Sequence, residues 1–202
     1  VYSDLKNKRV FISGGGSGIG ATIVEHFCEQ KSEVYFIDID LKSSKKLIKK
    51  IKKKGYRVPK FIECNILDVK KLQNIIKDII SKKGAIHCLI NSAANDDRHT
   101  TEQVDEKYWE NRMGINLKHY FFAAQAVVKG MKKIKSGSIV NLSSVSWMLG
   151  EGDKVVYETA KSAVVGLTRS FAQEFGKYNI RTNSVIPLSL IHISEPTRPD
   201  EI

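Results

Sequence analysis

The chain has 202 residues, of which 42% are hydrophobic, and both values fit one domain with a buried core. No stretch approaches the roughly 18 to 20 apolar residues of a membrane span, and no apolar run precedes the first strand-like segment, so we expect a soluble, cytoplasmic protein without a membrane partner. Much of the net charge of +11 lies between residues 42 and 60. There Leu47, Ile48 and Ile51 mark one apolar helical face, and the lysines occupy the solvated remainder of the helix. No nucleic-acid reading motif accompanies the lysines, so a nucleic-acid partner is not expected.

The three cysteines predict neither a disulfide nor a metal site. Cys28, Cys64 and Cys88 form an odd set without a CxxC pair, and each lies inside an apolar segment. We therefore expect buried, reduced thiols.

Short β-branched runs alternate with longer segments of helical periodicity. In chain order the pattern predicts strand 9–13, helix 18–30, strand 33–38, helix 41–54, strand 58–63, helix 69–82, strand 87–91, helix 105–131, strand 138–143, helix 155–177 and strand 180–186. The strands lack polar alternation, which is typical of strands buried on both faces. The sequence therefore predicts an α/β fold, a doubly wound parallel sheet with right-handed crossovers in a single domain.

A glycine-rich turn follows the first predicted strand directly and opens the first helix. It reads Gly-Gly-Gly-Ser-Gly-Ile-Gly over residues 14–20, and its expected cofactor contacts are Gly14, Ser17, Gly18 and Ile19. Glycine permits positive φ and close backbone approach, and the helix N-terminus offers free N–H groups to a pyrophosphate. The turn therefore predicts a Rossmann-like dinucleotide site.

Asp38 ends the second predicted strand, about twenty residues after the turn, where a carboxylate can bind the hydroxyls of an adenosine ribose. Such a carboxylate would repel the 2′-phosphate of NADP, so we expect NAD as cofactor and NADP only as the weaker alternative. The simpler role for Asp38 is that of a loop cap. Asn65 and Ile66, after the third strand, are placed to meet adenine.

Tyr157 and Lys161 lie four residues apart, on one face of a predicted helix. A free tyrosine, with a pKa of about 10, is a poor base at neutral pH, but a neighbouring ammonium stabilises its phenolate. The pair alone is a common accident. Here Ser144 lies at a strand end upstream and Asn116 in a helical stretch before it, which favours a catalytic set.

With these motifs in place, residues 5–187 resemble the short-chain dehydrogenase/reductase family. The resemblance implies a catalytic tetrad of Asn116, Ser144, Tyr157 and Lys161, in which Tyr157 moves a hydroxyl proton and Ser144 orients the oxygen. Lys161 would bind the nicotinamide ribose and lower the tyrosine pKa, and Asn116 would hold a water in a proton relay. The cofactor contacts that the resemblance implies are completed by Ile39, Asn91, Ala93, Tyr157, Lys161 and Pro187.

The sequence departs from the family pattern at several positions. Ser13 stands where threonine is usual, and Asn65 where aspartate is usual. The structural Asn-Asn-Ala-Gly motif appears as Asn-Ser-Ala-Ala over residues 91–94, which changes two of its four positions.

Further stretches are similar to D-xylose 1-dehydrogenases and other aldose 1-dehydrogenases of this family. They are residues 95–99, 108–112, 124–127 and 145–150. A polar loop beside the nicotinamide suits a substrate with many hydroxyls. The expected substrate contacts are Asn95, Asp96, Ser144, Ser146, Met148 and Tyr157, with Met148 standing where histidine is expected. The alternative is that residues 95–99 form a loop that only caps helices.

The resemblance implies NAD-dependent oxidation of the anomeric hydroxyl of a xylose-like aldose to a lactone. The alternatives are a reductase of 3-oxoacyl thioesters or other ketones, which Asp38 disfavours, and a dinucleotide-binding protein without turnover. A homo-oligomer, dimeric or tetrameric in the full-length parent, is expected from the family, and no metal is expected.

Residues 188–198 resemble the in-frame translation of a sequencing-library adapter, so we expect the genuine sequence to end near Pro187 and residues 188–202 to be a non-native tail. A dinucleotide-binding dehydrogenase domain over residues 1–187 is then C-terminally truncated. Without the remainder, the polypeptide is expected to be unstable or inactive.

Overall fold

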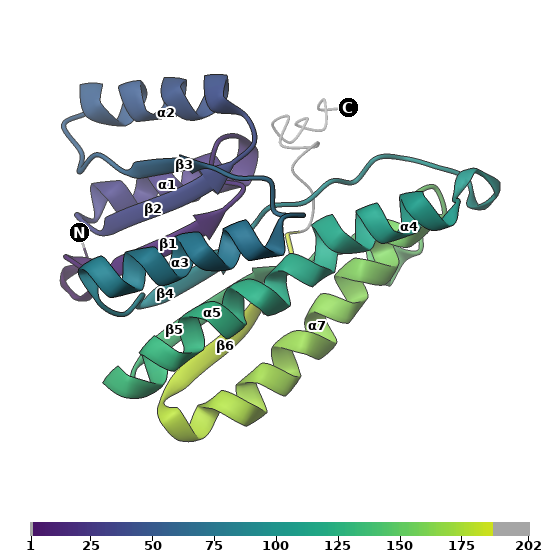
Figure 1. The fold of residues 1–202 in the computed structure, drawn as a ribbon. Coiled ribbons are helices and arrows are strands. Elements are labelled where there is room, and N and C mark those ends of the chain that lie inside the picture. The colour runs from purple at the N-terminus through teal and green to yellow at the C-terminus, as the bar shows by residue number, and fades with distance from the viewer. Residues whose placement is uncertain (1, 188–202) are drawn as a thin grey trace, which may run out of the picture.

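Six parallel strands form one sheet in a computed structural model that describes residues 2–187 (Figure 1). The strand order is β3-β2-β1-β4-β5-β6, the order of a Rossmann sheet. The order in which the chain adds strands reverses between β1 and β4, which is the switch point of the sheet. The strands are β1 (Arg9–Ser13), β2 (Glu33–Asp38), β3 (Lys60–Glu63), β4 (Cys88–Asn91), β5 (Gly137–Leu142) and β6 (Ile180–Val185). The predicted fold class is confirmed.

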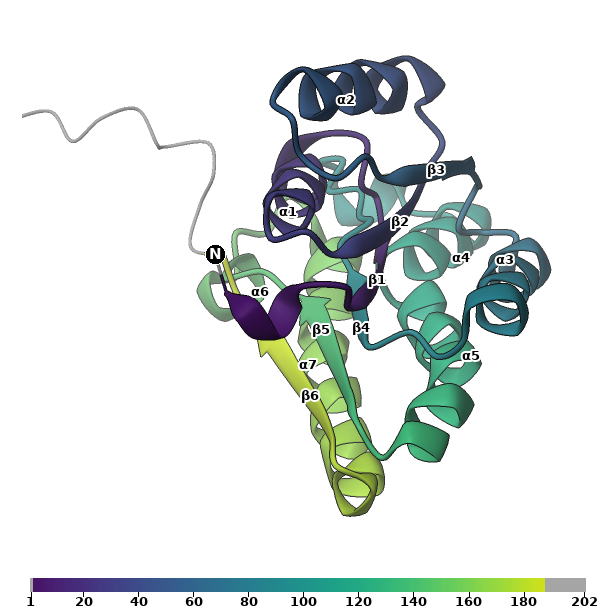
Figure 2. The same cartoon turned by 90° about the vertical axis from the view of Figure 1, so that its left-hand side faces the viewer.

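Helices cover both faces of the sheet (Figure 2). One face carries α1 (Gly18–Glu29) and α2 (Leu41–Lys53), and the other carries α3 (Val69–Lys83), α5 (His119–Ile134) and α7 (Val155–Phe175). Two shorter helices lie near the carboxyl ends of the strands: α4 (Glu106–Met113, labelled in Figure 1) and α6 (Ser146–Leu149, labelled in Figure 2). Turns of 3-10 helix occupy Ser3–Leu5, Thr101–Gln103 and Gly176–Tyr178, and a π-helical turn occupies Gly114–Lys118.

Two apolar clusters, one on each face, hold these layers together. Phe11 and Leu89 are fully buried in the cluster that meets α3, α5 and α7, while their neighbours Ile12 and Ile90 pack toward α1 and α2. The four inner strands, β2, β1, β4 and β5, bury side chains on both faces, so their sequences show little polar alternation. The expectation of strands buried on both faces is wrong for β3, whose residues are half-buried or exposed, and for β6, which alternates buried Ile180 and Thr182 with exposed Arg181 and Asn183.

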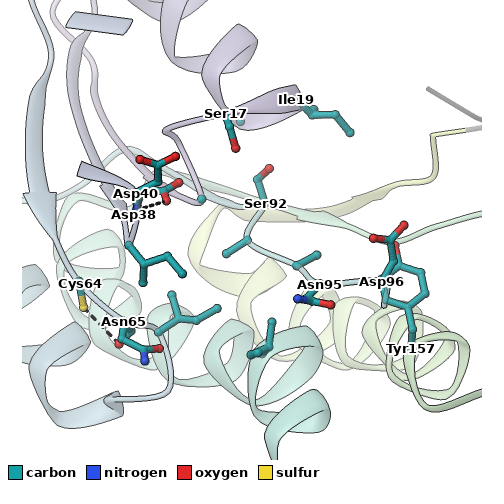
Figure 3. A pocket seen from close by; sticks show the side chains of 18 residues that line it. Ser17, Ile19, Asp38, Asp40, Cys64, Asn65, Ser92, Asn95, Asp96 and Tyr157 are labelled. Carbon is teal, nitrogen blue, oxygen red and sulfur yellow. Dashed lines mark hydrogen bonds between the residues drawn. The ribbon is translucent and has the colours of Figure 1, made fainter. Parts of the chain in front are cut away.

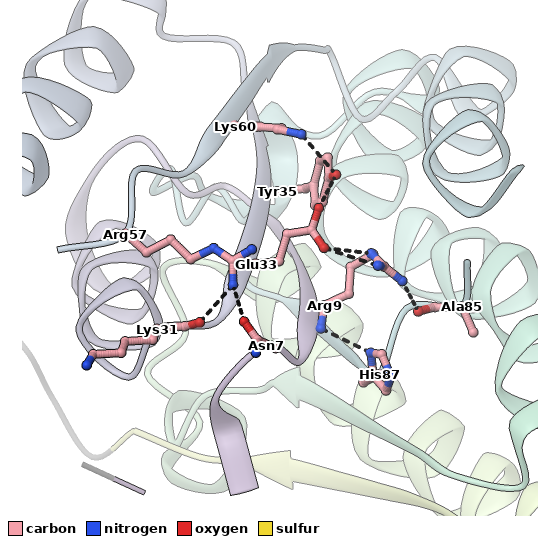
Figure 4. Close-up of polar contacts among 9 residues, drawn as sticks. All are labelled: Asn7, Arg9, Lys31, Glu33, Tyr35, Arg57, Lys60, Ala85 and His87. Atoms are coloured by element: carbon pink, nitrogen blue, oxygen red, sulfur yellow. Dashed lines mark hydrogen bonds and ion pairs between the residues drawn. The ribbon is translucent and has the colours of Figure 1, made fainter. Parts of the chain in front are cut away.

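The amino ends of the strands are fastened by polar contacts on the side remote from the glycine turn (Figure 4). Arg9 on β1 contacts Glu33 on β2 at 3.1 Å and donates to the carbonyl of Ala85 at 2.8 Å. Tyr35 donates to Glu33 at 2.7 Å. Burial by itself would raise the pKa of Glu33, but the hydrogen bond from Tyr35 and the charge of Arg9 lower it. This end of the sheet therefore depends on an ionised Glu33.

Most predicted elements agree with the structure to within a few residues, and the exceptions have physical causes. The strand predicted from residue 58 begins at Lys60, because Pro59 has no N–H for the ladder. The single helix predicted over residues 105–131 is α4, the π-helical turn and α5 in succession, and α6 was not predicted. Residues 188–202, including the adapter-like segment, lie outside the described residues.

Within residues 2–187 no helix is both long and apolar enough to cross a membrane. The same residues contain no group of three or more acidic, histidine and cysteine side chains that could hold a metal ion. Cys28, Cys64 and Cys88 are free, and burial raises the pKa of Cys28 and of Cys88 to about 12, so these thiols are poor nucleophiles.

Candidate dinucleotide and catalytic site

The glycine turn between β1 and α1 needs glycine for close packing. Gly14 has a φ of 68°, and a Cβ there would meet the Cα of Ala93 at 2.6 Å. A Cβ on Gly20, in the first turn of α1, would overlap the carbonyl oxygen of Gly14. The turn is therefore pressed against both α1 and the loop after β4, as a phosphate-binding turn requires.

Ser13, at the end of β1, ties this turn to the neighbouring strand. Its hydroxyl accepts from the backbone N–H groups of Ser92 and Ala93, at 3.2 and 3.3 Å. The serine thus fixes the loop after β4 although threonine is usual at this position in the family.

The carboxylate of Asp38 is held in place by backbone groups. It accepts from the N–H of Gly16 at 2.8 Å and from the N–H of Asp40 at 2.9 Å. A Cβ on Gly16 would lie 2.9 Å from the same carboxylate, so the glycine turn makes room for it. Asp40 caps α2 by accepting from Ser43, and it lies beside Asp38 at the cavity wall (Figure 3).

A cavity of about 630 Å³ runs along the carboxyl ends of β1, β2 and β4 (Figure 3). It lies at the switch point of the sheet, where this fold binds ligands. Its walls include the predicted cofactor residues Gly14, Ser17, Gly18, Ile19, Asp38, Ile39, Asn65, Ile66, Ala93 and Tyr157. Ser17 precedes α1 without a side-chain cap on the helix, and the first turn carries no acidic residue. The site therefore fits a dinucleotide: an uncapped helix N-terminus for the pyrophosphate and a fixed carboxylate for the ribose.

A second cavity, of about 460 Å³, adjoins the first. Five residues line both: Ile19, Ser92, Ala94, Asp96 and Tyr157. The second cavity also contains the predicted residues Ser144, Ser146, Lys161 and Pro187. Tyr157 therefore stands at the junction of the two cavities, with Asp96 close to it (Figure 3).

Ser144 and Tyr157 are brought together by β5, α6 and α7. The hydroxyl of Ser144 lies 2.9 Å from that of Ser146 and accepts from the backbone N–H of Ser146 at 3.3 Å. Burial raises the pKa of Tyr157, and a hydrogen bond with Ser144 opposes that rise. Ionisation of Tyr157 therefore depends on nearby stabilising groups.

Lys161 lies one turn below Tyr157 on α7 and is fully buried. Its ammonium donates to the hydroxyl of Tyr120 at 2.9 Å and to the carbonyl of Leu142 at 2.8 Å, and it lies 5.5 Å from the centre of the Tyr157 ring. Burial lowers the pKa of Lys161 to about 7, and the negative charge of Asp96 opposes that fall.

Asn116 lies in the π-helical turn, fully buried, and its side chain holds the loop after β4. It accepts from the N–H of Asn95 and donates to the carbonyl of Asn95, both at 2.9 Å. The oxygen and the nitrogen of the side-chain amide are thus both hydrogen-bonded to the backbone of the loop. The expected role of Asn116 in holding a water stays a prediction.

His99 connects the same loop to α7. Its Nε2 atom accepts from the backbone N–H of Val156 at 3.3 Å, next to Tyr157, while its Nδ1 atom lies 2.9 Å from the hydroxyl of Tyr108. Arg112 contacts Asp97 at 2.5 Å and covers the ring of Tyr108. The loop is thereby attached to α4 and to the start of α7.

Three predicted site residues line neither cavity: Asn116, described above, Asn91 and Met148. Asn91 is fully buried beneath the site, where it donates to Asn141 at 2.9 Å, and its expected cofactor contact stays a prediction. Met148 is 54% exposed. The short helix α6 turns Ser146 and Leu149, three residues apart, toward the second cavity and leaves Met148 outside it.

Sequence reasoning also missed residues of the site. Tyr120 carries no motif that marks it, because it acts through a contact with a residue distant in sequence. His99 lies in the stretch 95–99 that resembles aldose dehydrogenases, but that stretch did not indicate its contact with the start of α7. Glu151 and Lys154 also line the second cavity, and they contact each other at 2.6 Å. In the sequence, only their position just after the residues of α6 could have indicated that they belong to the site.

Comparison with known proteins agrees with this geometry. The family model described as short chain dehydrogenase matches residues 8–190. The chain is 39% identical over 186 residues to a Rhizobium meliloti protein named probable galactose dehydrogenase, covering 92% of this chain and 73% of that protein. It is 40% identical over 188 residues to a Caulobacter vibrioides D-xylose 1-dehydrogenase, covering 93% and 73%. The structure of Thermoplasma acidophilum aldohexose dehydrogenase is similar at a TM-score of 0.82 and 28% identity, covering 94% of this chain and 69% of that one.

Proposed function

The chain belongs to the short-chain dehydrogenase family of nicotinamide-dependent oxidoreductases, and we propose that it oxidises the anomeric hydroxyl of a neutral aldose to a lactone, with NAD as the hydride acceptor. The observation that carries this proposal is the position of Tyr157 at the junction of the two cavities. One cavity suits the cofactor and the other suits the sugar. A side chain that lines both cavities can move a proton at the point where the sugar and the cofactor would meet.

The cofactor would be held by the first cavity. The N-terminus of α1, with Ser17, Gly18 and Ile19, would bind the pyrophosphate, and Asp38 would bind the adenosine ribose. The carboxylates of Asp38 and Asp40 both lie at that wall, so a 2′-phosphate would meet two negative charges. This arrangement supports NAD rather than NADP.

The proton would be moved by the chain's own residues. The phenolate oxygen of Tyr157 takes the proton of the anomeric hydroxyl. The hydroxyl of Ser144 holds the anomeric oxygen of the sugar during the step. The ammonium of Lys161 supplies the positive charge that favours the phenolate. A nicotinamide cofactor held in the first cavity would supply the acceptor for the hydride that leaves the anomeric carbon.

Asn95 and Asp96 would bind the other hydroxyls of the sugar. Asp96 borders both cavities, and Asn116 and His99 fix the loop on either side of it. A carboxylate accepts hydrogen bonds from neighbouring hydroxyl groups, whereas it repels a phosphate or a carboxylate on a substrate. The loop therefore supports a neutral sugar, in line with relatives named for galactose and D-xylose.

The test is NADH formation with a panel of aldoses that includes D-xylose and D-galactose. Tyr157→Phe is expected to abolish turnover and to leave NAD binding in place. Surviving turnover in this variant would refute the assignment of Tyr157. Reduction of 3-oxoacyl thioesters without aldose oxidation would favour the reductase alternative, and NAD binding without any turnover would favour a non-catalytic role.

A further inference from the structure

Lys161 is the buried cation of the site, and its partners are few. The side chain is 1% exposed, and its ammonium has three N–H donors. Two of them are used, by the hydroxyl of Tyr120 on α5 and by the carbonyl of Leu142 at the end of β5. Both acceptors are neutral. A buried ammonium stays protonated only where such acceptors are fixed in place.

Tyr120 is itself fixed. Its side chain is fully buried, and its hydroxyl donates to the same carbonyl of Leu142 at 2.9 Å. Because the proton of that hydroxyl points at Leu142, the lone pairs of the oxygen are available to the ammonium. Burial raises the pKa of Tyr120 far above its ordinary value, so this phenol remains neutral and acts only as an acceptor toward Lys161.

The ammonium lies near two phenol rings. Its distance to the ring centre is 5.1 Å for Tyr120 and 5.5 Å for Tyr157. Both distances are within reach of a favourable cation–π interaction. Tyr120 lines neither cavity and contacts Lys161 within the core, whereas Tyr157 lines both cavities.

We infer that Tyr120 is a positioning residue for Lys161, whose hydroxyl holds the ammonium beneath Tyr157 and thereby favours ionisation of Tyr157. The inference rests on the proposed role of Tyr157 as the base. Tyr120 touches neither cavity, and it acts through Lys161 alone.

Other charged groups also face this pair. Asp96, from the loop after β4, favours the ammonium of Lys161 and opposes a negative charge on Tyr157. His119, from α5, is buried and neutral, with its pKa lowered to about 3 by burial. Lys154 favours the Tyr157 phenolate and Glu151 opposes it. These four groups are unchanged by removal of one oxygen atom from Tyr120, so a Tyr120→Phe variant isolates the contact with Lys161.

The experiment is a spectrophotometric titration of phenolate in the free protein. The difference between the wild type and Tyr157→Phe isolates Tyr157 from the other tyrosines. In the Tyr120→Phe background we expect the Tyr157 midpoint to move toward alkaline pH by about one unit, which means about tenfold less phenolate below the midpoint. The kcat/KM profile of an active preparation is expected to move in the same direction, with activity recovered at high pH. A uniform loss of activity at every pH, with an unmoved midpoint, would overturn the inference.

Two controls make the result specific. Tyr56→Phe removes a hydroxyl that contacts Glu29, far from the site, and is expected to leave the Tyr157 midpoint in place. In a Lys161→Met background, Tyr120→Phe is expected to have no further effect on the midpoint. An equal shift with and without Lys161 would mean that Tyr120 acts by some other route, and the inference would fail.

If Tyr120→Phe does not fold, the wild type still provides a test. The protein is labelled with 15N at lysine and 13C at tyrosine. As Lys161 loses its proton, the ring signal of the neutral Tyr120 is expected to shift with the same midpoint as the Nζ signal of Lys161. Different midpoints for the two signals would contradict the inference. None of these titrations requires turnover. If the protein oxidises no aldose but the Tyr157 midpoint shifts in Tyr120→Phe, the proposed function is wrong and the inference stands. If the protein oxidises a sugar but the midpoint does not move, the proposed function stands and the inference is wrong.

Discussion

Replacement of His99 should weaken the start of the helix that carries Tyr157. The Nδ1 atom of His99 lies 3.0 Å from the carbonyl of Asp97, which can only accept, so Nδ1 carries the proton and Nε2 is left as an acceptor. That acceptor receives the N–H of Val156, a residue 1% exposed. Lys154, at the N-cap position of α7, makes no side-chain cap, so His99 serves as the cap from another segment.

Two amide variants separate the functions of the two ring nitrogens. In His99→Gln the side-chain oxygen can reach the position of Nε2 and still accept from Val156, whereas in His99→Asn it reaches only the position of Nδ1. An unpartnered buried N–H costs about 1 to 3 kcal/mol, so we expect His99→Asn to lower the free energy of unfolding by about 2 kcal/mol and His99→Gln by about 1 kcal/mol less.

The assay is urea unfolding combined with amide hydrogen exchange. A local loss of 1.4 kcal/mol corresponds to about tenfold faster exchange, and we expect it in the peptide that covers the first turn of α7 in His99→Asn. Exchange in α3, on the same face of the sheet, is the internal reference. Equal destabilisation by Asn and Gln, without faster exchange at the start of α7, would refute the capping role.

Three further predictions concern the glycine turn, the cofactor and the sheet. Gly20→Ala should lose NAD binding and about 1 to 3 kcal/mol of stability, because its methyl group would overlap Gly14, whereas Gly166→Ala in α7, where nothing lies within 4 Å, should be neutral or stabilising; fluorescence titration and thermal melts check both. Asp38→Ser should raise the ratio of kcat/KM for NADP over NAD by about 100-fold, since a like-charge contact costs several kcal/mol, and an unchanged ratio would remove Asp38 from cofactor selection. Glu33→Gln should cost about 1 kcal/mol at neutral pH; because folding lowers the pKa of Glu33 from 4.5, the advantage of the wild type is complete above that value and disappears as pH falls through the folded pKa, which urea titrations at several pH values would detect.

The fold could be predicted from local sequence because its four inner strands are buried on both faces and its helices are amphipathic. The errors occur where the backbone departs from regular geometry. Pro59 delays β3, and the π-helical turn around Asn116 interrupts a helix whose side-chain pattern continues through it. A π-helical turn adds one residue to a helical turn, and nothing in the composition of Gly114–Lys118 marks that insertion.

The candidate site divides in the same way. Tyr157 and Lys161 could be paired from sequence because four residues along a helix bring two side chains to one face. Tyr120 and Leu142 could not be added to them, since their contacts join α5, β5 and α7 across the core. Met148 is expected among the substrate contacts from its position in a motif; it does not line the second cavity, because the short helix α6 leaves it outside, and its substrate contact stays a prediction. Motif spacing identifies groups that act along one element, and contacts between elements require the structure.

The fastening of the loop after β4 bears on how substrate choice is set. Asn116 holds its beginning at Asn95 with two hydrogen bonds, and His99 holds its end on α7. Asp96 lies between these two points and borders both cavities. Because both ends are tied to the elements that carry Asn116 and Tyr157, a shift of the loop must also disturb the π-helical turn or the start of α7. A change of sugar preference should therefore be easier to reach by a substitution at Asp96 that keeps the carboxylate charge, such as Asp96→Glu, than by any change in the length of the loop, because the charge of Asp96 also acts on Lys161 and Tyr157.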